Sequence, residues 1–319
     1  MHSVSACRKI ERGNRFCTGG RHSGYTIPAN IKARAAQTGK DHMLPSYLTD
    51  TNLSSIKLVA TDMDLTLLTD DKSMPEGVDE RINALVQNGI IFCAASGRPA
   101  LALREEFPAH HQDMALISDN GASVYLRGEL IYKNLLDNDL YHELLARCVE
   151  TGRGVPVLCS LDDAYILERD RAHHDELSIY YRDITYVDSF ETLDVESNKI
   201  SILCPDWDSK EQFDTIYSSE FGDRVYVTCS GGEWIDFMNL GIDKGSGIRH
   251  VAEHLGIDLA DVAAFGDTYN DIPMLDIVGH SYVMGNAAEH MHDHGKFLAP
   301  SNNEAGVLTV IDRIIEATA

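Results

Sequence analysis

Four clusters of polar residues stand at the ends of apolar runs or at the start of a helix, where their side chains could do chemistry. They are Asp62-x-Asp64-x-Thr66, Ser96 with Arg98, Lys244, and the run from Gly266 to Asp271. The carboxyl ends of parallel strands meet at one edge of a sheet, so these clusters would bring four carboxylates, a lysine amine and small hydroxyl or amide groups to one rim. Carboxylates crowded this way repel one another unless a cation is present, and hard oxygen ligands favour Mg²⁺.

The elements that would position these clusters follow from the hydrophobic pattern. Short apolar runs at 56–61, 90–95, 114–117 and 262–265 are typical of buried parallel strands. Segments with helical spacing lie at 76–88, 244–255 and 307–315. The alternation predicts an α/β fold, a Rossmann-like parallel-sheet core with right-handed crossovers. A lone Asp-x-Asp is more often a turn, but four clusters in this order favour one site.

The middle of the chain has a different character. Residues 122–126 and 130–133 flank a turn and indicate a hairpin, and a helix near 171–182 is followed by several short strands that look antiparallel. This mixture predicts a second, α+β domain inserted into the first. We expect the core domain at 55–136 and 237–319 and the inserted cap domain at 137–236.

The first 54 residues carry eight Lys/Arg and three Asp/Glu, a net charge of +5, without sustained periodicity. They contain no apolar run of the kind a secretory signal has. Their Arg-rich, acid-poor character is faintly similar to a transit peptide, but it favours a disordered extension or an over-long start of the sequence. We exclude residues 1–54 from the predicted fold.

Composition limits the possible partners. The formal net charge is −23, from 50 acidic and 27 basic residues, and it disfavours general nucleic-acid or membrane binding. No apolar run approaches the roughly 20 residues of a membrane span. The seven cysteines are scattered without a CxxC pair, which indicates neither a disulfide framework nor a zinc ribbon and fits a reducing cytoplasm. We expect a cytoplasmic protein, a monomer or small homo-oligomer.

The four clusters resemble the four signature motifs of the haloacid dehalogenase-like superfamily. The details are similar to its Cof-type hydrolases, which carry a large α/β cap between the second and third motifs. The resemblance covers about residues 55–319 and extends to the runs 119–122, 284–287 and 301–307. One position departs from the family pattern: residue 65 is Leu where the family most often has Gly.

The resemblance implies a mechanism and a role for each matching residue. Asp62 would attack a phosphomonoester and become an aspartyl-phosphate, while Asp64 would act first as general acid and then as general base. Ser96, Lys244 and Asn270 would contact the phosphoryl group, Asn270 by binding it or by orienting the nucleophile. The remaining expected roles are loop geometry next to the phosphate for Thr66, and Mg²⁺ binding by Asp62, the backbone carbonyl of Asp64, Asp267 and Asp271.

The expected activity is a Mg²⁺-dependent phosphatase for small phosphorylated metabolites, either sugar phosphates or cofactor phosphates. Two alternatives stay open: a phosphosugar mutase similar to phosphomannomutase, and a non-catalytic sensor of phosphorylated ligands. Arg98 could orient the Ser96 loop or pair with a carboxylate. Other residues have weaker signals, namely Arg171, His173 and Tyr181 as cap contacts, and His290, His292 and His294, which fit a solvated surface better than a metal site.

Overall fold

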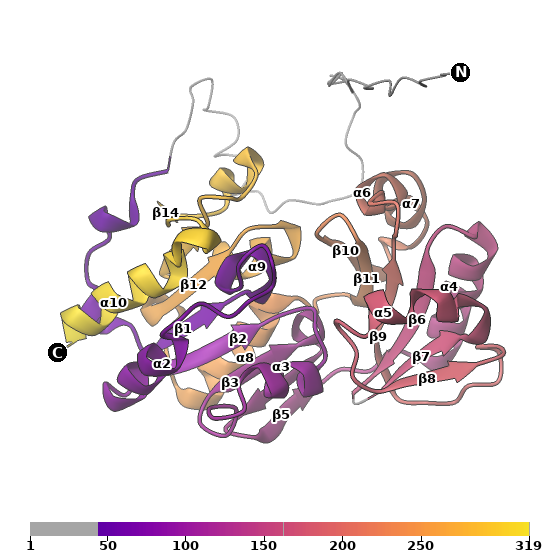
Figure 1. Ribbon diagram of the computed structural model, residues 1–319, viewed down its shortest axis with the longest axis horizontal. Coiled ribbons are helices and arrows are strands. Elements are labelled where there is room, and N and C mark those ends of the chain that lie inside the picture. Colours follow the sequence, from indigo (N-terminus) through magenta and orange to yellow (C-terminus); the bar gives the residue numbers. More distant parts are fainter. Residues whose placement is uncertain (1–43, 162, 319) are drawn as a thin grey trace, which may run out of the picture. The chain divides into compact units, whose positions relative to one another are not determined.

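The computed structural model describes residues 44–161 and 163–318 (Figure 1). Its larger sheet has eight strands in the order β14-β13-β12-β1-β2-β3-β4-β5. In chain order their bounds are β1 (Leu58–Thr61), β2 (Ile91–Ala95), β3 (Ala115–Ser118), β4 (Ser123–Leu126), β5 (Glu129–Lys133), β12 (Val262–Gly266), β13 (His280–Val283) and β14 (Phe297–Leu298). The strands from β14 to β3 pair in parallel, and β3, β4 and β5 pair antiparallel. The predicted parallel-sheet α/β core is confirmed.

Helices cover both faces of this sheet. They are α2 (Val78–Gln87), α3 (Ala100–Glu106) and α10 (Gly306–Thr318) on one face, with α8 (Lys244–Leu255) and α9 (Ile272–Leu275) on the other. Successive side chains of β1 alternate between the two faces: Val59 packs with the first group of helices, and Leu58 and Ala60 with the second. Burial on both faces explains why β1 reads as a continuous apolar run. Among the described residues, no helix combines the length and apolar character that a membrane crossing requires.

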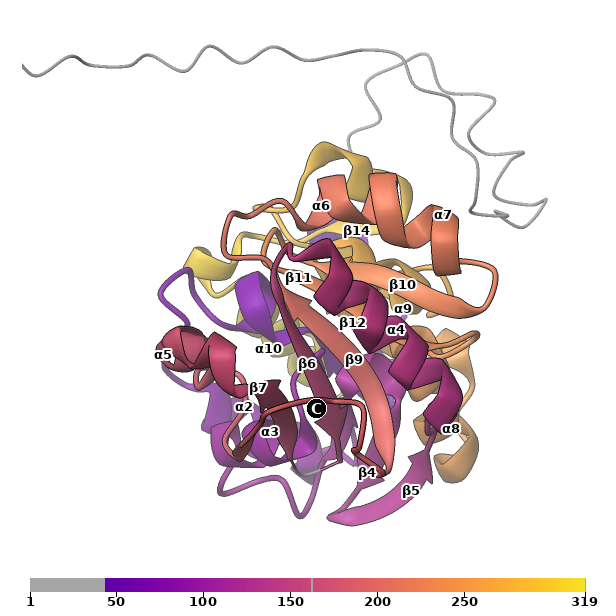
Figure 2. The same cartoon turned by 90° about the vertical axis from the view of Figure 1, so that its right-hand side faces the viewer.

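A second sheet of six strands has the order β10-β11-β9-β6-β7-β8 (Figure 2). Its strands are β6 (Val155–Ser160), β7 (Ala164–Leu167), β8 (Ile184–Val187), β9 (Ser197–Leu203), β10 (Val225–Ser230) and β11 (Trp234–Asn239). All pairs are antiparallel except β7 with β8. Its helices are α4 (Asn138–Thr151), α5 (His174–Leu177), α6 (Ser209–Gln212) and α7 (Ser218–Phe221). Strand β11 runs past the expected end of the cap at residue 236.

The helix expected near 171–182 forms only in part. A 3-10 segment covers Glu168–His173, and α5 then ends at Leu177. Leu177 is the buried residue of α5, and none is buried in the 3-10 segment. The expected helix would bury two apolar side chains, Leu177 and Tyr181, so little packing would stabilise it.

Residues 1–43 of the expected N-terminal extension lie outside the described residues. Residues 44–54, in contrast, pack against the core. Asp50 is buried and accepts hydrogen bonds from His280 Nδ1 (2.8 Å) and the Tyr282 hydroxyl (2.5 Å). Leu53 joins the apolar cluster beneath α10. The folded region therefore starts before the expected boundary at residue 55.

The cysteines of the described residues are buried free thiols. Burial raises the pKa of Cys159 to about 11 and that of Cys148 to about 12. Thiols held in the neutral form are poor nucleophiles and poor metal ligands, so these cysteines act as small packing residues.

Gly121 lies in the turn between β3 and β4, against the start of α8. It has φ of +101°, and an added Cβ would lie 2.2 Å from the backbone oxygen of Asp243. We expect Gly121→Ala to lower the free energy of unfolding by about 2–4 kcal/mol, because it adds overpacking to left-handed strain. Urea unfolding followed by circular dichroism measures this.

The matched control is Gly89→Ala, since Gly89 has φ of +72° but no atom within 4 Å of its added Cβ. We expect this variant to lose only about 1 kcal/mol, from backbone strain alone. Equal losses in the two variants would contradict the role of the Asp243 contact.

Candidate active site

The first acidic cluster lies in the loop that leaves β1. The Asp62 backbone N–H donates to the Phe265 carbonyl (3.0 Å), which continues the pairing of β1 with β12. Leu65, the departure from the expected glycine, has φ of 62° and ψ of 9°. Its carbonyl accepts a hydrogen bond from Asn286 Nδ2 (2.8 Å), and its side chain is 43% exposed. The loop therefore accommodates a Cβ in a left-handed conformation that favours glycine.

A lysine amine joins two of the predicted carboxylates. Lys244 Nζ lies 2.5 Å from Asp62 Oδ1 and 2.6 Å from Asp271 Oδ1. One oxygen each from Asp62, Asp267 and Asp271 lie within 4.8 Å of one another, and these residues form the one such acidic, His or Cys group found among the described residues. Three buried carboxylates against one ammonium leave uncompensated negative charge at this point.

The pKa values of Asp62 and Asp267 reflect this excess of negative charge. Burial, followed by the Asp271 carboxylate, raises the pKa of Asp62 to about 7, while Lys244 acts to lower it. The pKa of Asp267 is raised well above its usual value by burial and by the carboxylates of Asp271 and Asp62. A cation would relieve this repulsion and favour the ionised carboxylates.

Strand β12 and the turn after it hold two of these carboxylates. Asp271 Oδ2 accepts from the backbone N–H groups of Asp267 (2.9 Å) and Thr268 (3.1 Å). Thr66 Oγ1 donates to Asp267 Oδ1 (3.0 Å), so Thr66 supports an acidic residue in this structure. Gly266 is required here, because its added Cβ would lie 2.5 Å from Asp271 Cβ.

Arg98 pairs with carboxylates rather than standing free. Its Nε and Nη2 donate to the two Asp64 oxygens at 2.9 and 2.6 Å, and its Nη1 donates to Glu106 (3.0 Å). The Arg98 backbone N–H also donates to Ser96 Oγ (3.1 Å). This bidentate contact fixes the direction of the Asp64 carboxylate and links it to the Ser96 loop.

Asn270 lies in the same region but uses its amide to hold neighbours. Its Nδ2 donates to Asn120 Oδ1 (3.0 Å) and to Ser230 Oγ (3.1 Å). Its Oδ1 is buried and accepts no hydrogen bond from the described residues. Both amide hydrogens are therefore engaged, which fits orientation of the site better than direct phosphate binding.

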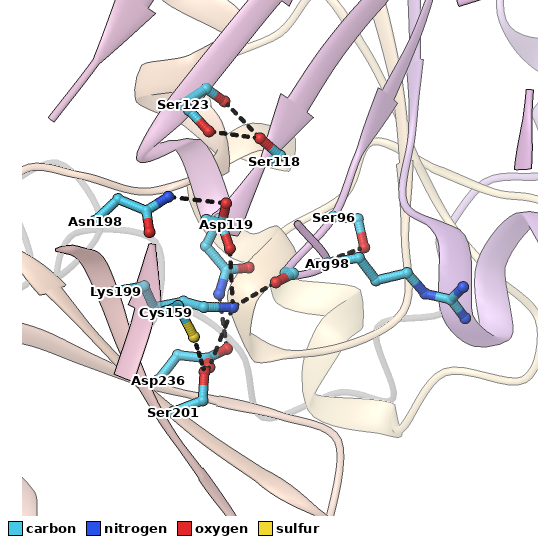
Figure 3. Close-up of polar contacts among 12 residues, drawn as sticks. Ser96, Arg98, Ser118, Asp119, Ser123, Cys159, Asn198, Lys199, Ser201 and Asp236 are labelled. Atoms are coloured by element: carbon cyan, nitrogen blue, oxygen red, sulfur yellow. Dashed lines mark hydrogen bonds and ion pairs between the residues drawn. The ribbon is translucent and has the colours of Figure 1, made fainter. Parts of the chain in front are cut away.

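A buried charge network that sequence reasoning missed joins the two sheets (Figure 3). Lys199 Nζ, from β9, donates to the Gly97 carbonyl and lies 3.4 Å from Asp119 and 3.7 Å from Asp236. Asn198 Nδ2 donates to the second oxygen of Asp119 (2.9 Å). The network thus binds the inserted sheet to the loop that carries Ser96.

The network continues from β11 back to the catalytic rim. Asp236 accepts from Ser201 Oγ (2.6 Å), Ser230 Oγ (2.8 Å) and Asn120 Nδ2 (2.8 Å). Asn120 in turn accepts from Asn270. The sequence does hold a signal for this network. Lys199 and Asp236 are charged residues within otherwise apolar buried strands, and such residues need partners.

A cavity of about 220 Å³ opens over these groups. Its core side includes Asp62, Asp64, Ser96, Asp267 and Asn270, and its cap side includes Tyr180, Tyr181, Lys199, Trp207, Glu233 and Trp234. Of the three residues suggested as cap contacts, Tyr181 lines the cavity. Arg171 instead pairs with Glu168 at the surface, and His173 lies against Glu176.

The three histidines near residue 292 do not form a metal site in the described residues. His290 stacks on Tyr269 with ring centroids 4.5 Å apart, and His294 Nδ1 lies 3.2 Å from Asp276. His290 is exposed. These contacts fit the expected surface role.

Comparison with known proteins gives consistent results. Residues 59–311 match the haloacid dehalogenase-like hydrolase family. The chain is 32% identical over 270 residues to the 5-amino-6-(5-phospho-D-ribitylamino)uracil phosphatase of Escherichia coli K12, covering 83% of this chain and 98% of that protein. It is 28% identical over 232 residues to an HMP-PP phosphatase of Shigella flexneri, covering 72% and 85%.

Among solved structures, a Streptococcus mutans UA159 protein superposes with a TM-score of 0.77 at 26% identity, covering 82% of this chain and 99% of that one. Another, from Plasmodium vivax, is described as a HAD/COF-like hydrolase and has a TM-score of 0.75 at 22% identity, covering 85% and 98%. At 22% identity, the likeness to the Plasmodium vivax protein concerns the fold alone. The chain therefore belongs to the haloacid dehalogenase-like hydrolase family, as a phosphatase of the Cof type.

Proposed function

We propose that this phosphatase depends on Mg²⁺ and hydrolyses monoesters of small phosphorylated metabolites through an aspartyl-phosphate on Asp62. The observation that carries the proposal is the convergence of Asp62, Asp267 and Asp271 beside the Lys244 amine, at the floor of a cavity. The names of the two curated relatives, both phosphatases of small metabolites, support the substrate class.

The donor set suits Mg²⁺. Carboxylate oxygens from Asp62 and Asp267 would bind the ion, together with the backbone carbonyl of Asp64. Asp271 would support them from behind, because Lys244 and two backbone N–H groups already occupy its oxygens. The ion would offset the negative charge of the carboxylates and of the transferring phosphoryl group.

The side chains of the chain itself account for bond making and breaking. An Asp62 oxygen forms a bond to phosphorus as the ester P–O bond breaks, and Asp64, protonated once it has left its ion pair with Arg98, gives its proton to the departing alcohol. Asp64 then takes a proton from a water molecule that attacks the phosphorus, which releases inorganic phosphate and restores Asp62. Lys244 holds Asp62 in place, and Ser96 faces the same cavity to contact the phosphoryl oxygens.

The inserted sheet would exclude water while the intermediate exists. The Lys199 network supports a closed arrangement, since it joins strands β9 and β11 to the Gly97 and Asp119 segments. The division into a core at 55–136 and 237–319 and a cap at 137–236, the cytoplasmic location and the oligomeric state stay predictions.

Metal removal tests the proposal directly. After dialysis against a chelator, we expect phosphate release from a panel of phosphorylated metabolites to fall to background and to return when Mg²⁺ is added. The reason is that the crowded carboxylates need a cation to offset their charge. Undiminished release after thorough chelation would contradict the metal assignment, and an isomer formed with little free phosphate would indicate a mutase instead.

Loss of the nucleophile is the second test. We expect Asp62→Asn to lower turnover by roughly a thousand-fold or more, because a carboxamide cannot form the covalent intermediate. Asp276→Asn is the control, since Asp276 is exposed and pairs with His294 away from the cavity. Unchanged turnover in Asp62→Asn would contradict the role of Asp62 as the nucleophile.

A separate prediction concerns the stability that the buried Lys199 network contributes. Lys199→Met leaves Asp119 and Asp236 without their cation, and we expect the free energy of unfolding to fall by about 3 kcal/mol or more. Adding Asp119→Asn to this variant should recover part of the loss. Denaturant unfolding measures both.

The control variant for that test is Lys57→Met. Lys57 is paired with Asp261 but its side chain is 57% exposed, so we expect a loss of less than about 1 kcal/mol. Similar losses for the buried and exposed lysines would show that the network does not stabilise the fold as described.

A further inference from the structure

One large aromatic side chain of the cavity wall is exposed. Trp207 lies in the loop between β9 and α6, and it is 68% exposed although it lines the cavity that contains Asp62 and Asp64. Trp207 has φ of 58°, a left-handed conformation that a bulky side chain rarely adopts. Backbone strain that presents an apolar ring to solvent at a catalytic cavity is typical of a ligand contact.

One edge of the Trp207 indole contacts the protein. A Cβ added to Gly232 would lie 2.8 Å from Trp207 Cε3, so the indole rests on the glycine backbone in the turn between β10 and β11. The Trp207 backbone N–H also donates to the Cys204 carbonyl (3.0 Å). The indole is therefore a supported platform with most of its surface available.

The other cavity aromatics already pack against neighbours. Tyr180 and Trp234 meet edge to face with centroids 5.1 Å apart, and Lys72 Nζ lies 4.3 Å from the centroid of the Tyr180 ring. Tyr181 also packs edge to face on Trp234 (6.0 Å). Among the described residues, no aromatic ring stacks on Trp207. A flat ligand would find its stacking partner there.

A carboxylate adds a polar contact on the same side. Glu233 follows Gly232, lines the cavity and accepts a hydrogen bond from the Tyr180 hydroxyl at 2.9 Å. A carboxylate accepts from N–H groups and repels additional phosphate. The pair of Trp207 and Glu233 therefore suits a flat group with N–H donors at its edge.

From this juxtaposition we propose that the leaving group carries a planar, nitrogen-containing ring that stacks on Trp207 and directs ring nitrogen or amino groups toward Glu233. The inference rests on the proposed phosphatase function, since it describes the alcohol side of that substrate. The phosphoryl group would lie at Asp62, and the ring at the cap side of the same cavity. Trp207 is in this view a specificity-determining residue.

A matched pair of substrates tests the ring contact. Cytidine 5′-monophosphate and ribose 5-phosphate share the phosphorylated ribose and differ in the base. We expect wild-type kcat/KM to be higher for the nucleotide. Trp207→Ala should lower it by roughly 10- to 100-fold, mainly through KM, because loss of base stacking has effects of this size. The variant should change ribose 5-phosphate hydrolysis by less than about twofold, and Trp207→Phe should retain most of the preference.

The control is Leu48→Ala, which removes another exposed apolar side chain, 61% exposed, outside the cavity. It should leave both substrates unaffected. Equal loss on the two substrates in Trp207→Ala, or no loss on the nucleotide, would overturn the ring contact.

A binding measurement separates this inference from the proposed function. Cytidine, which has no phosphate, should quench the tryptophan fluorescence of the wild-type protein, and the quenching should fall in Trp207→Phe, which keeps only Trp234 as a tryptophan of the cavity. Quenching without any phosphate release would leave the ring site standing and remove the phosphatase proposal. Phosphate release with no quenching and no preference for the ring substrate would overturn the ring site and leave the phosphatase proposal standing.

Discussion

The site depends on one ammonium placed among three carboxylates. Lys244 is fully buried and contacts both Asp62 and Asp271, while Asp267 lies close to the same two carboxylates. The position of Lys244 at the first turn of α8 follows from the Asp243 capping box, which begins that helix. Without this cation the acidic residues would repel one another still more strongly at the end of a buried strand. The capping box that starts α8 therefore also places the lysine of the site.

Much of the core could be predicted because its determinants are local. Strand β1 reads as an apolar run since both faces of its sheet are covered, and the polar residues after it mark the sheet edge. Helix α8 begins at Lys244 and ends at Leu255, as its spacing and the following Gly256 indicate. The convergence of Asp62, Lys244, Asp267 and Asp271 was expected from the order of the motifs.

The remaining features depend on contacts between distant segments. Lys199 and Asp236 occupy neighbouring strands of the inserted sheet, yet they meet Asp119 of the other sheet. No periodicity shows such a pairing before the topology is known. The contact of the Trp207 ring with Gly232 likewise joins distant segments, and residues 44–54 pack on the core through Asp50, which reaches His280 and Tyr282. Sequence patterns report which face is apolar, but not which buried charges become neighbours.

The Lys199 contacts also limit how the two sheets can separate. Its amine is held by the Gly97 carbonyl and lies near two carboxylates, with almost no solvent around it. Any displacement of β9 away from that loop would expose the Lys199 ammonium and the Asp119 carboxylate to water, while Asp236, on the neighbouring strand β11, would move with Lys199. Separation of the two sheets at this point must therefore break buried polar contacts and replace them with water.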